Sequence, residues 1–214
     1  MQSPESHALA TGLDTLGLPL DASQQSALLA YLALIGKWNK VYNLTAVRDP
    51  AEMLTVHLLD SLATVQPLAR HLGGRTARVL DVGSGAGLPG VVLAIALPHV
   101  TVTCVDTVGK KASFIQQVAN ELKLRNLSAQ HARVEALSIP PVDVVTSRAF
   151  TSLLDFTSLT ARHLGQDAVW MAMKGKRPSD EVANLPAGID VFHVEQLSVP
   201  CLNAERCLVW MRPR

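Results

Sequence analysis

Glycines recur at alternate positions in one segment of the chain, which reads DVGSGAGLPG from Asp81 to Gly90. Glycine lets a backbone turn sharply and approach a ligand closely. The β-branched run ARVLDV precedes this loop and an apolar helical stretch follows it, as in a strand–turn–helix unit that binds a nucleotide. A second apolar run ends at Asp106, about 20 residues further on, where a carboxylate can accept hydrogen bonds from ribose hydroxyls. Together these features predict a crevice for a cofactor that contains a nucleoside.

Two classes of cofactor fit such a crevice. A dinucleotide places its pyrophosphate on the helix N-terminus and uses the glycine spacing G-x-G-x-x-G. Here the spacing is D-x-G-x-G-x-G, and the carboxylate of Asp81 would repel a pyrophosphate. The same charge favours the cationic amino-acid end of S-adenosylmethionine, directly or through water. The motif therefore resembles that of the class I S-adenosylmethionine methyltransferases, with an NAD(P)-dependent oxidoreductase as the alternative.

The segment Thr146-Ser147-Arg148-Ala149-Phe150 follows the fourth strand of such a fold and bears on the atom that is methylated. Methyltransferases of exocyclic amines resemble one another in having Asn or Asp, Pro-Pro and an aromatic residue there, and this chain does not. Ring N7 of guanine has a free lone pair, so its methylation needs orientation and proximity but no general base. Arg148 could hold a base edge or a phosphate, and Phe150 could stack on a base. A structural role is equally open, with Arg148 paired to Asp143 or Asp155 and Phe150 in the core.

The elements that must position these residues begin with a helical region. Asp21 can cap a helix that runs through Ile35, because apolar residues recur there at helical spacing. The segment Asp49-Pro50-Ala51-Glu52 has the pattern of a capping box at the start of a second helix. Gly73-Gly74 closes this part of the chain. We therefore expect an N-terminal helical region over residues 1–72 and a second, α/β domain over residues 73–214.

The α/β domain is predicted from short β-branched runs that alternate with helical stretches. The runs are ARVLDVG, VTVTCVD, VDVVTSRAF, AVWMAMKG, VFHVEQLSV and RCLVWMRP. The early runs are apolar at consecutive positions, which indicates parallel strands covered on both faces, and the helices expected at 88–97, 110–122 and 153–164 complete βαβ units. Only the turn 200–205 separates the last two runs. We therefore expect a doubly wound, mostly parallel sheet that ends in an antiparallel hairpin at its edge.

Composition narrows the class of protein. The three cysteines are an odd number without a CxxC pair, which argues against a disulfide framework and a zinc site, so we expect no metal. Cys201 lies in the late hairpin, where we expect a small apolar residue and not a nucleophile for carbon methylation. The longest apolar stretch, 27–35, is shorter than the roughly 20 residues of a membrane helix. The segment MQSPESHALA lacks the pattern of a signal peptide, so we expect a cytoplasmic protein without a membrane partner.

The formal net charge is +1, but basic residues gather locally. The clusters are Lys37, Lys40 and Arg48; Lys110 and Lys111; and Lys174, Lys176 and Arg177. Such a cluster taken alone is best interpreted as a solvated face, although it can also contact nucleic acid.

The motifs taken together resemble one family nearly end to end, the ribosomal RNA small-subunit methyltransferase G family, also called glucose-inhibited division protein B. The matching segments are KWNKVYNLT (37–45), RDP (48–50), HLLDS (57–61), DVGSGAGLPG (81–90), Asp106 with GKK (109–111), RVE (133–135), SRA (147–149) and KG (174–175). The resemblance implies a Rossmann-like class I fold with a seven-stranded sheet, so that residues 73–214 are an S-adenosylmethionine-dependent methyltransferase domain. It also implies methylation at N7 of one guanine in the 530 loop of 16S ribosomal RNA.

The resemblance also implies roles for individual residues. Cofactor contacts are expected at Asp81, Gly83, Gly85, Gly87, Leu88, Asp106, Val134, Glu135 and Arg148, of which Arg148 is also the candidate catalytic residue. Candidate RNA contacts are Asn39, Arg48, His57, Lys110, Lys111, Phe150 and Lys174.

Three further expectations concern the pair His57 and Asp60, the partner and the class of protein. His57 and Asp60 are three residues apart, so they share a helix face and could hydrogen-bond each other. The pair could contact RNA over the mouth of the cofactor crevice, or form a structural latch between the helical region and the sheet domain. The expected partner is 16S ribosomal RNA or the small ribosomal subunit, bound by a monomer. A non-catalytic RNA-binding assembly factor with the same fold is the second alternative. The combination of Asp81, the three glycines and Asp106 argues against that factor, because only a cofactor requires them together.

Overall fold

The N-terminal region is helical in the computed structural model, which describes residues 3–214. Met1 and Gln2, the first residues of the segment judged to lack a signal peptide, lie outside the described residues. The helices of this region are α1 (Pro4–Leu16), α2 (Ala22–Tyr42), α3 (Pro50–Met53), a π-helical segment (Leu54–Leu59), α4 (Asp60–Leu62) and α5 (Val65–Leu72). No helix within residues 3–214 is long and apolar enough to cross a membrane.

Side-chain caps explain where these helices begin. Asp21 and Gln24 form a reciprocal capping box at the start of α2, with each backbone N–H donating to the other residue's side chain. At the start of α3, the Asp49 carboxylate accepts a hydrogen bond of 2.9 Å from the backbone N–H of Glu52. The reciprocal bond to the Glu52 side chain is not found among the described residues, so half of the predicted capping box is present.

The rest of the chain forms one seven-stranded sheet with helices between its strands. The strands are β1 (Ala77–Val82), β2 (Val100–Asp106), β3 (Leu127–His131), β4 (Val142–Arg148), β5 (Leu164–Lys174), β6 (Ile189–Leu197) and β7 (Arg206–Pro213). The helices are α6 (Gly90–Ala96), α7 (Gly109–Glu121), α8 (Leu153–Thr160) and α9 (Ser179–Ala183). The strand order is β3-β2-β1-β4-β5-β7-β6, with β1 to β5 parallel and β7 antiparallel to both of its neighbours. The expected doubly wound sheet with its terminal hairpin is therefore confirmed.

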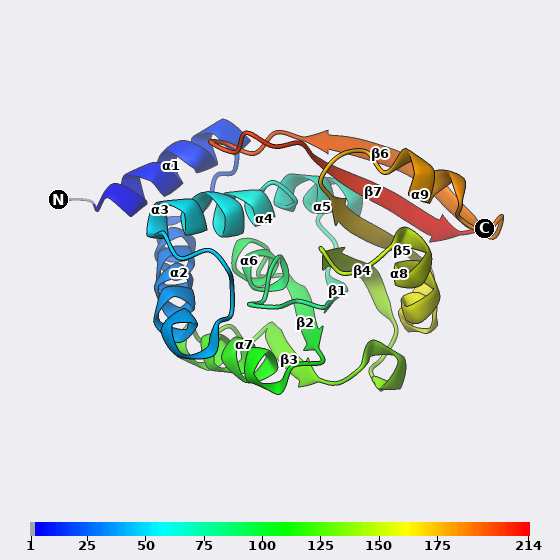
Figure 1. Cartoon of the computed structure of the whole chain (residues 1–214), viewed down its shortest axis with the longest axis horizontal. Helices are drawn as coiled ribbons and strands as arrows, with labels where there is room; N and C mark the ends of the chain where they lie inside the picture. Colours follow the sequence, from blue (N-terminus) through cyan, green and yellow to red (C-terminus); the bar gives the residue numbers. More distant parts are fainter. Residues whose placement is uncertain (1–2) are drawn as a thin grey trace.

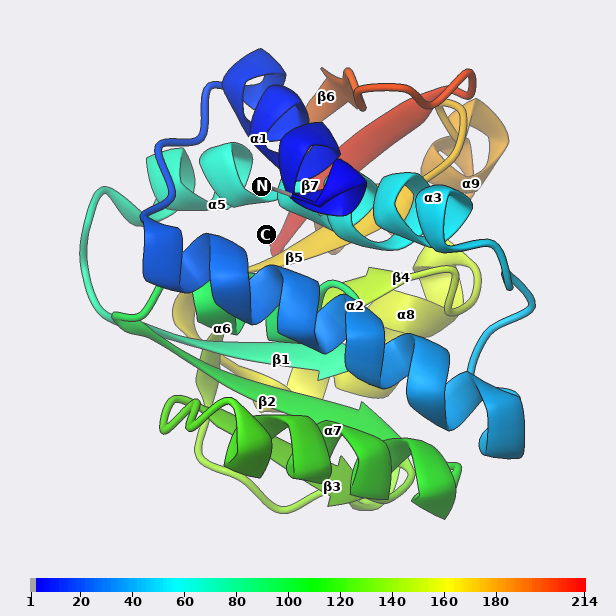
Figure 2. The same cartoon turned by 90° about the vertical axis from the view of Figure 1, so that its left-hand side faces the viewer.

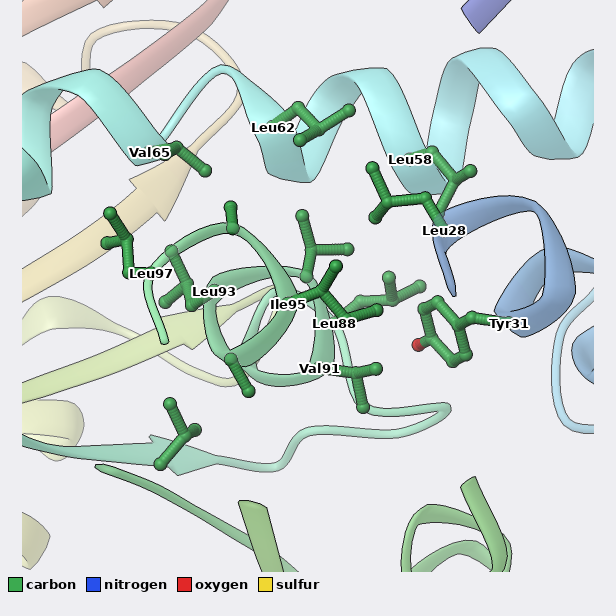
Figure 3. Close-up of a cluster of buried hydrophobic side chains, with 14 of the residues drawn as sticks. Leu28, Tyr31, Leu58, Leu62, Val65, Leu88, Val91, Leu93, Ile95 and Leu97 are labelled. Carbon is green, nitrogen blue, oxygen red and sulfur yellow. The ribbon is translucent and has the colours of Figure 1, made fainter. Parts of the chain in front are cut away.

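Helices cover both faces of the sheet, as Figure 1 shows. The helices α2, α6 and α7 pack on one face, and α8 packs on the other. Neighbouring strand residues such as Val144 and Val145 belong to separate hydrophobic clusters on the two faces, which explains why the strands are apolar at consecutive positions. Figure 3 shows the larger cluster around α6, where Leu28 and Leu58 from the helical region approach Leu88 and Val91.

The helical region and the sheet share this larger cluster, which contains Leu9 and Leu62 as well as Val79 and Leu208. The helix α2 lies across the sheet in Figure 2, and its C-terminal end reaches beyond the carboxyl ends of β1 and β2. The division at residues 72 and 73 stays a prediction about sequence organisation.

The strand order reverses direction between β1 and β4, which are neighbours although β2 and β3 separate them in sequence. In open α/β sheets, ligands bind outside the carboxyl ends of the strands at such a switch point. The loops that follow Val82 and Arg148 therefore flank the expected binding crevice.

Candidate functional site

The glycine-rich loop after β1 has a backbone that only glycine adopts easily. Gly83, Gly85 and Gly87 have φ angles of +65°, +59° and +92°. A Cβ atom at Gly83 would lie 2.6 Å from the ring of Phe150, and one at Gly87 would lie 2.4 Å from a methyl group of Val91. The predicted sharp turn is present, and close packing as well as φ requires glycine at two of its positions.

Asp81 lies beneath this loop and is fully buried. Its Oδ2 accepts a hydrogen bond of 2.8 Å from the backbone N–H of Gly90 and lies 3.9 Å from the Sγ of Cys104. Its Oδ1 has no hydrogen-bond partner among the described residues. Burial raises the pKa of Asp81 to about 7, against the opposing effect of the Gly90 N–H. A buried carboxylate with one unpaired oxygen is a group that a cation or a bridging water can complete.

Asp106 ends β2 and joins the glycine loop to the loop that precedes α7. Its Oδ2 accepts a hydrogen bond of 2.9 Å from the Gly85 N–H, and its Oδ1 accepts one of 2.8 Å from the Val108 N–H. The ammonium of Lys111 lies 4.0 Å from Oδ2. Each carboxylate oxygen can accept a second hydrogen bond, so the group retains the capacity to bind ribose hydroxyls.

Tyr31 of α2 supports the glycine loop from the helical region, a role that the sequence analysis did not assign. Its hydroxyl donates a hydrogen bond of 2.6 Å to the carbonyl of Ala86 within the buried core. Burial raises the pKa of the Tyr31 phenol well above its ordinary value, so the group remains a donor. Tyr31 contributes to the apolar stripe of α2 in the sequence, and that stripe carries no signal for this contact.

Val134 and Glu135 form a short 3-10 turn (Val134–Ala136) after β3. The carbonyl of Asp106 accepts a hydrogen bond of 3.2 Å from the N–H of Ala132, which places the turn next to the end of β2. Val134 is buried, and its carbonyl accepts a hydrogen bond of 2.8 Å from His163. The structure therefore brings this predicted pair close to the predicted ribose site.

Arg148 ends β4 on the other side of the switch point. Its Nη1 donates hydrogen bonds to the carbonyl of Val56, at 2.8 Å, and to Oδ2 of Asp60, at 2.9 Å. The suggested structural partners, Asp143 and Asp155, are both wrong. Asp143 accepts from the backbone of β1, and Asp155 accepts from side chains at the start of α8, so both carboxylates are occupied locally.

His57 and Asp60 do not bond to each other, so the hydrogen bond that their spacing suggested is wrong. The Nε2 of His57 lies 2.9 Å from Oγ1 of Thr45, whereas Asp60 binds Arg148 and also the Nε of Arg206, at 2.8 Å. The π-helical turn that contains His57 has more residues per turn than an α-helix, so residues three apart diverge. The latch that was expected of the pair is formed by Asp60 alone, because His57 binds within the helical region.

Two of the RNA candidates are buried supports of the loop between α2 and α3. The side-chain oxygen of Asn39 accepts a hydrogen bond of 2.9 Å from the Thr45 N–H, and its nitrogen donates to the carbonyl of Val47. Burial and the nearby charge of Arg148 lower the pKa of His57 to about 4, so the ring is neutral at pH 7. Asn39 and His57 are almost fully buried, and their side chains support the fold of that loop, so a direct contact with RNA stays a prediction.

The other RNA candidates differ in their exposure. Arg48 and Lys110 are exposed, and Lys111 turns toward Asp106. The ammonium of Lys174 is engaged by Glu181, at 2.8 Å, and by a backbone carbonyl. Phe150 is half-buried, against Gly83 and edge-on to a second phenylalanine ring.

Two hollows open near these residues. One, of about 400 Å³, lies where β4 and β5 end and β7 begins, and is lined by Val56, Asp60, Arg148, Ala149, Met173, Lys174, Gly175 and Arg206. The other, of about 670 Å³, lies between α1, α2 and α3, and its lining includes Lys37, Lys40 and Arg48. Among residues 3–214, no group of three or more His, Cys, Asp or Glu side chains could hold a metal ion.

Solved structures with the same fold are methyltransferases in several cases. TrmN from Thermus thermophilus matches with a TM-score of 0.56 and 19% identity, covering 75% of this chain and 53% of that one. A SAM-dependent methyltransferase from Aquifex aeolicus matches with a TM-score of 0.54 and 18% identity, covering 76% of this chain and 98% of that one. At these identities the likeness establishes the fold alone, a Rossmann-like class I methyltransferase fold.

Sequence relatives are much closer. A protein of Acidovorax sp. (strain JS42), named Ribosomal RNA small subunit methyltransferase G, is 60% identical over 215 residues, which span 97% of this chain and 95% of the relative. A protein of the same name from Polaromonas sp. (strain JS666 / ATCC BAA-500) is 62% identical over 208 residues, covering 95% and 92%. The sequence model of the family described as rRNA small subunit methyltransferase G matches residues 24–209. The loop, the carboxylates and the arginine described above all fall inside that match, and the chain belongs to the rRNA small subunit methyltransferase G family.

Proposed function

We propose that this protein transfers the methyl group of S-adenosylmethionine to N7 of a guanine in the 530 loop of 16S ribosomal RNA. Membership of a family whose relatives are named as methyltransferases of small-subunit ribosomal RNA supports the class of reaction and substrate. The observation that carries the proposal for the site is the unpaired Oδ1 of buried Asp81 beneath three glycines with positive φ, at the switch point of the sheet. We further propose that the protein acts on ribosomal RNA in the cytoplasm and as a monomer.

The residues at the switch point fit the cofactor. The unpaired oxygen of Asp81 suits the cationic amino-acid end, the loop from Gly83 to Gly87 lets the backbone approach closely, and Asp106 retains acceptors for the ribose. Leu88 and Val134 are buried apolar groups that can border the nucleoside, with Glu135 beside Val134. When bound, S-adenosylmethionine supplies a methyl group that is already activated on a sulfonium.

The acceptor chemistry agrees with the side chains near β4. Guanine N7 attacks through a free lone pair, so the enzyme must orient the base but need not remove a proton. Arg148 uses its Nη1 for internal hydrogen bonds and has further N–H donors for the O6 of a guanine or for a phosphate. Phe150, half-buried beside Gly83, can stack on the base.

Alternatives of other classes are less well supported. A nicotinamide dinucleotide would place its pyrophosphate near Asp81, whose charge opposes it. A non-catalytic assembly factor would have no need for the unpaired buried carboxylate, which costs stability unless something binds it. Calorimetric titration with S-adenosylmethionine and with NAD separates these cases, because an oxidoreductase would bind only NAD and an assembly factor would bind neither.

The proposed reaction is tested on ribosomal RNA from cells that lack this protein. We expect cleavage chemistry specific for N7-methylguanine to detect one site fewer than in the parent strain, in the 530 loop. Expression of the wild-type protein should restore the site, and Arg148→Ala should not, although it should remain folded. An unchanged cleavage pattern in the deletion strain would refute the N7 assignment, and full activity of Arg148→Ala would remove Arg148 from the site.

A further inference from the structure

Two arginine side chains bind one buried carboxylate at the end of the sheet where the parallel strands finish. Arg148 ends β4 and Arg206 begins β7, and β5 lies between these strands. Because β7 is antiparallel, its first residues lie next to the end of β5, where Cys207 pairs with Lys174. The two guanidinium groups bind the two oxygens of Asp60, at 2.9 Å and 2.8 Å. The sequence analysis assigned no role to Arg206.

Asp60 orients both guanidinium groups but cannot neutralise both. Its side chain is 2% exposed, whereas those of Arg148 and Arg206 are 21% and 23% exposed. Arg148 makes its internal hydrogen bonds through Nη1, and Arg206 makes its own through Nε and Nη1. A guanidinium has five N–H donors, so the Nη2 of each arginine still has donors to offer. The group has one net positive charge and a fixed geometry.

The hollow of about 400 Å³ lies directly against these arginines. Val56, Ala149 and Met173 give it apolar walls, and Lys174 adds an ammonium whose charge Glu181 balances. Apolar walls with two preset guanidinium groups suit a ligand that combines a flat base with an anionic group. Guanidinium groups bind phosphate oxygens in this way, often through paired hydrogen bonds.

We propose that Arg206, together with Arg148, binds a phosphate of the RNA nucleotide that accepts the methyl group, and that Asp60 holds both arginines in place. The inference rests on the proposed action on RNA. The hollow lies on the β5 and β7 side of Arg148, whereas Asp81, the glycine loop and Asp106 lie on the β1 and β2 side. The cofactor and the phosphate therefore lie on opposite sides of Arg148. The methyl donor and the acceptor base then meet beside Arg148.

The experiment compares guanosine 5′-monophosphate with guanosine as probes, using the full-length protein saturated with S-adenosylhomocysteine so that the cofactor crevice is filled. Calorimetry should show that the wild type binds the monophosphate at least about tenfold more tightly than guanosine, as one charge-assisted hydrogen bond allows. Arg206→Ala should markedly reduce that difference, because Arg148 alone is then left to bind the phosphate. Arg212→Ala is the matched control, because Arg212 lies on the same strand in an exposed ion pair with Asp190, and it should keep the difference.

A second readout separates phosphate binding from a purely structural role. Arg206→Ala should retain the affinity of the protein for S-adenosylmethionine. The slope of the logarithm of its RNA-binding constant against the logarithm of salt concentration should become shallower by about one, because one phosphate contact is lost. Arg206→Lys keeps the charge without the forked geometry and should bind the monophosphate with intermediate affinity.

Three results would overturn the proposal. One is equal affinity of the wild type for the two probes, another is an unchanged preference in Arg206→Ala, and the third is joint loss of cofactor binding and of the preference. A wild type that prefers the monophosphate but leaves 16S ribosomal RNA unmethylated would support the phosphate site and refute the proposed function.

Discussion

Replacement of Asp81 by asparagine should uncouple cofactor binding from pH. Asp81 is fully buried, and burial raises its pKa to about 7, so about half of the carboxyl groups carry a proton at pH 7 in the protein without ligand. A cation bound beside the unpaired Oδ1 favours the ionised form. Binding of S-adenosylmethionine should therefore expel that proton, and the affinity should rise with pH until Asp81 is ionised without help.

The size of this effect follows from the pKa. With Asp81 ionised in the complex, the affinity falls about tenfold for each pH unit below 7, so the dissociation constant at about pH 6 should be roughly tenfold that at about pH 8. The stability of the ligand-free protein has the opposite trend. Because the folded pKa exceeds the ordinary value of 3.8, the unfolding free energy falls as pH rises from about 4 to about 7, by at most roughly 4 kcal/mol.

Calorimetry in two buffers with different ionisation enthalpies measures the released protons directly. We expect about half a proton per cofactor at pH 7 for the wild type. Asp81→Asn, which keeps the acceptor for the Gly90 N–H, should release no protons. The free energy of unfolding of Asp81→Asn should rise relative to that of the wild type as pH rises. Wild-type binding that is independent of pH and releases no protons would show that the cofactor does not interact with the Asp81 charge.

Three further substitutions test the support of the site. Because the pKa of His57 is lowered to about 4, the unfolded chain takes up a proton before the folded protein does as pH falls, and the free energy of unfolding should drop by at most about 3 kcal/mol between about pH 6.5 and about pH 4. In urea unfolding, His57→Gln should lose less stability than the wild type over this pH range, and an equal loss would contradict the assignment. Tyr31→Phe removes the hydrogen bond to the Ala86 carbonyl, so it should lower the free energy of unfolding by about 1–3 kcal/mol and weaken cofactor binding. As a control, Tyr42→Phe at an exposed tyrosine should change neither quantity in the same denaturation and titration series. Gly87→Ala would place a Cβ atom 2.4 Å from a side chain of α6 at a residue with a φ of +92°. We expect the free energy of unfolding to fall by more than about 1 kcal/mol and cofactor binding to be lost. A variant with wild-type Tm and affinity would show that the loop can relax to accept the methyl group.

The sheet could be predicted from local sequence wherever its strands are buried. Five of the seven strands (β1, β2, β4, β5 and β7) are apolar runs with mostly buried residues, because both faces of the sheet are covered there. β6 also has an apolar run, with Ile189, Val191, Phe192 and Val194, although it is an edge strand and only Leu197 is buried within it. β3 is the exception, and only the resemblance to the family implied a seventh strand. It lies at the opposite edge of the sheet from β6, and Leu127 is the one large apolar residue in its sequence LSAQH, so the segment lacks the apolar pattern that identifies a strand.

The glycine loop was predictable for a different reason. Positive φ angles at Gly83, Gly85 and Gly87 favour glycine at each position, so the spacing of the glycines in the sequence predicts the conformation of the loop. The hydrogen bond from Tyr31 has no such signature, because it joins residues 55 positions apart and a tyrosine in an apolar stripe fits the core equally well. Side chains that support the loop from another element depend on how that element packs.

Asp60 shows where reasoning from sequence spacing ends and reasoning from topology can begin. Spacing suggested His57 as its partner, but a buried carboxylate needs cations within reach in space, and the chain supplies them from 88 and 146 residues away. Once the final strand is taken to be antiparallel to the parallel strands, as the resemblance to class I methyltransferases implies, its first residues must lie where the parallel strands end. Arg148 and Arg206 could therefore have been placed on one edge in advance. The helix that crosses this edge could not, because its path is set by the packing of Leu58 and Leu62 against α6. Hydrophobic contacts of the helical region thus determine which carboxylate meets the two arginines, and a substitution that shifts α4 should disturb the proposed phosphate site without touching it.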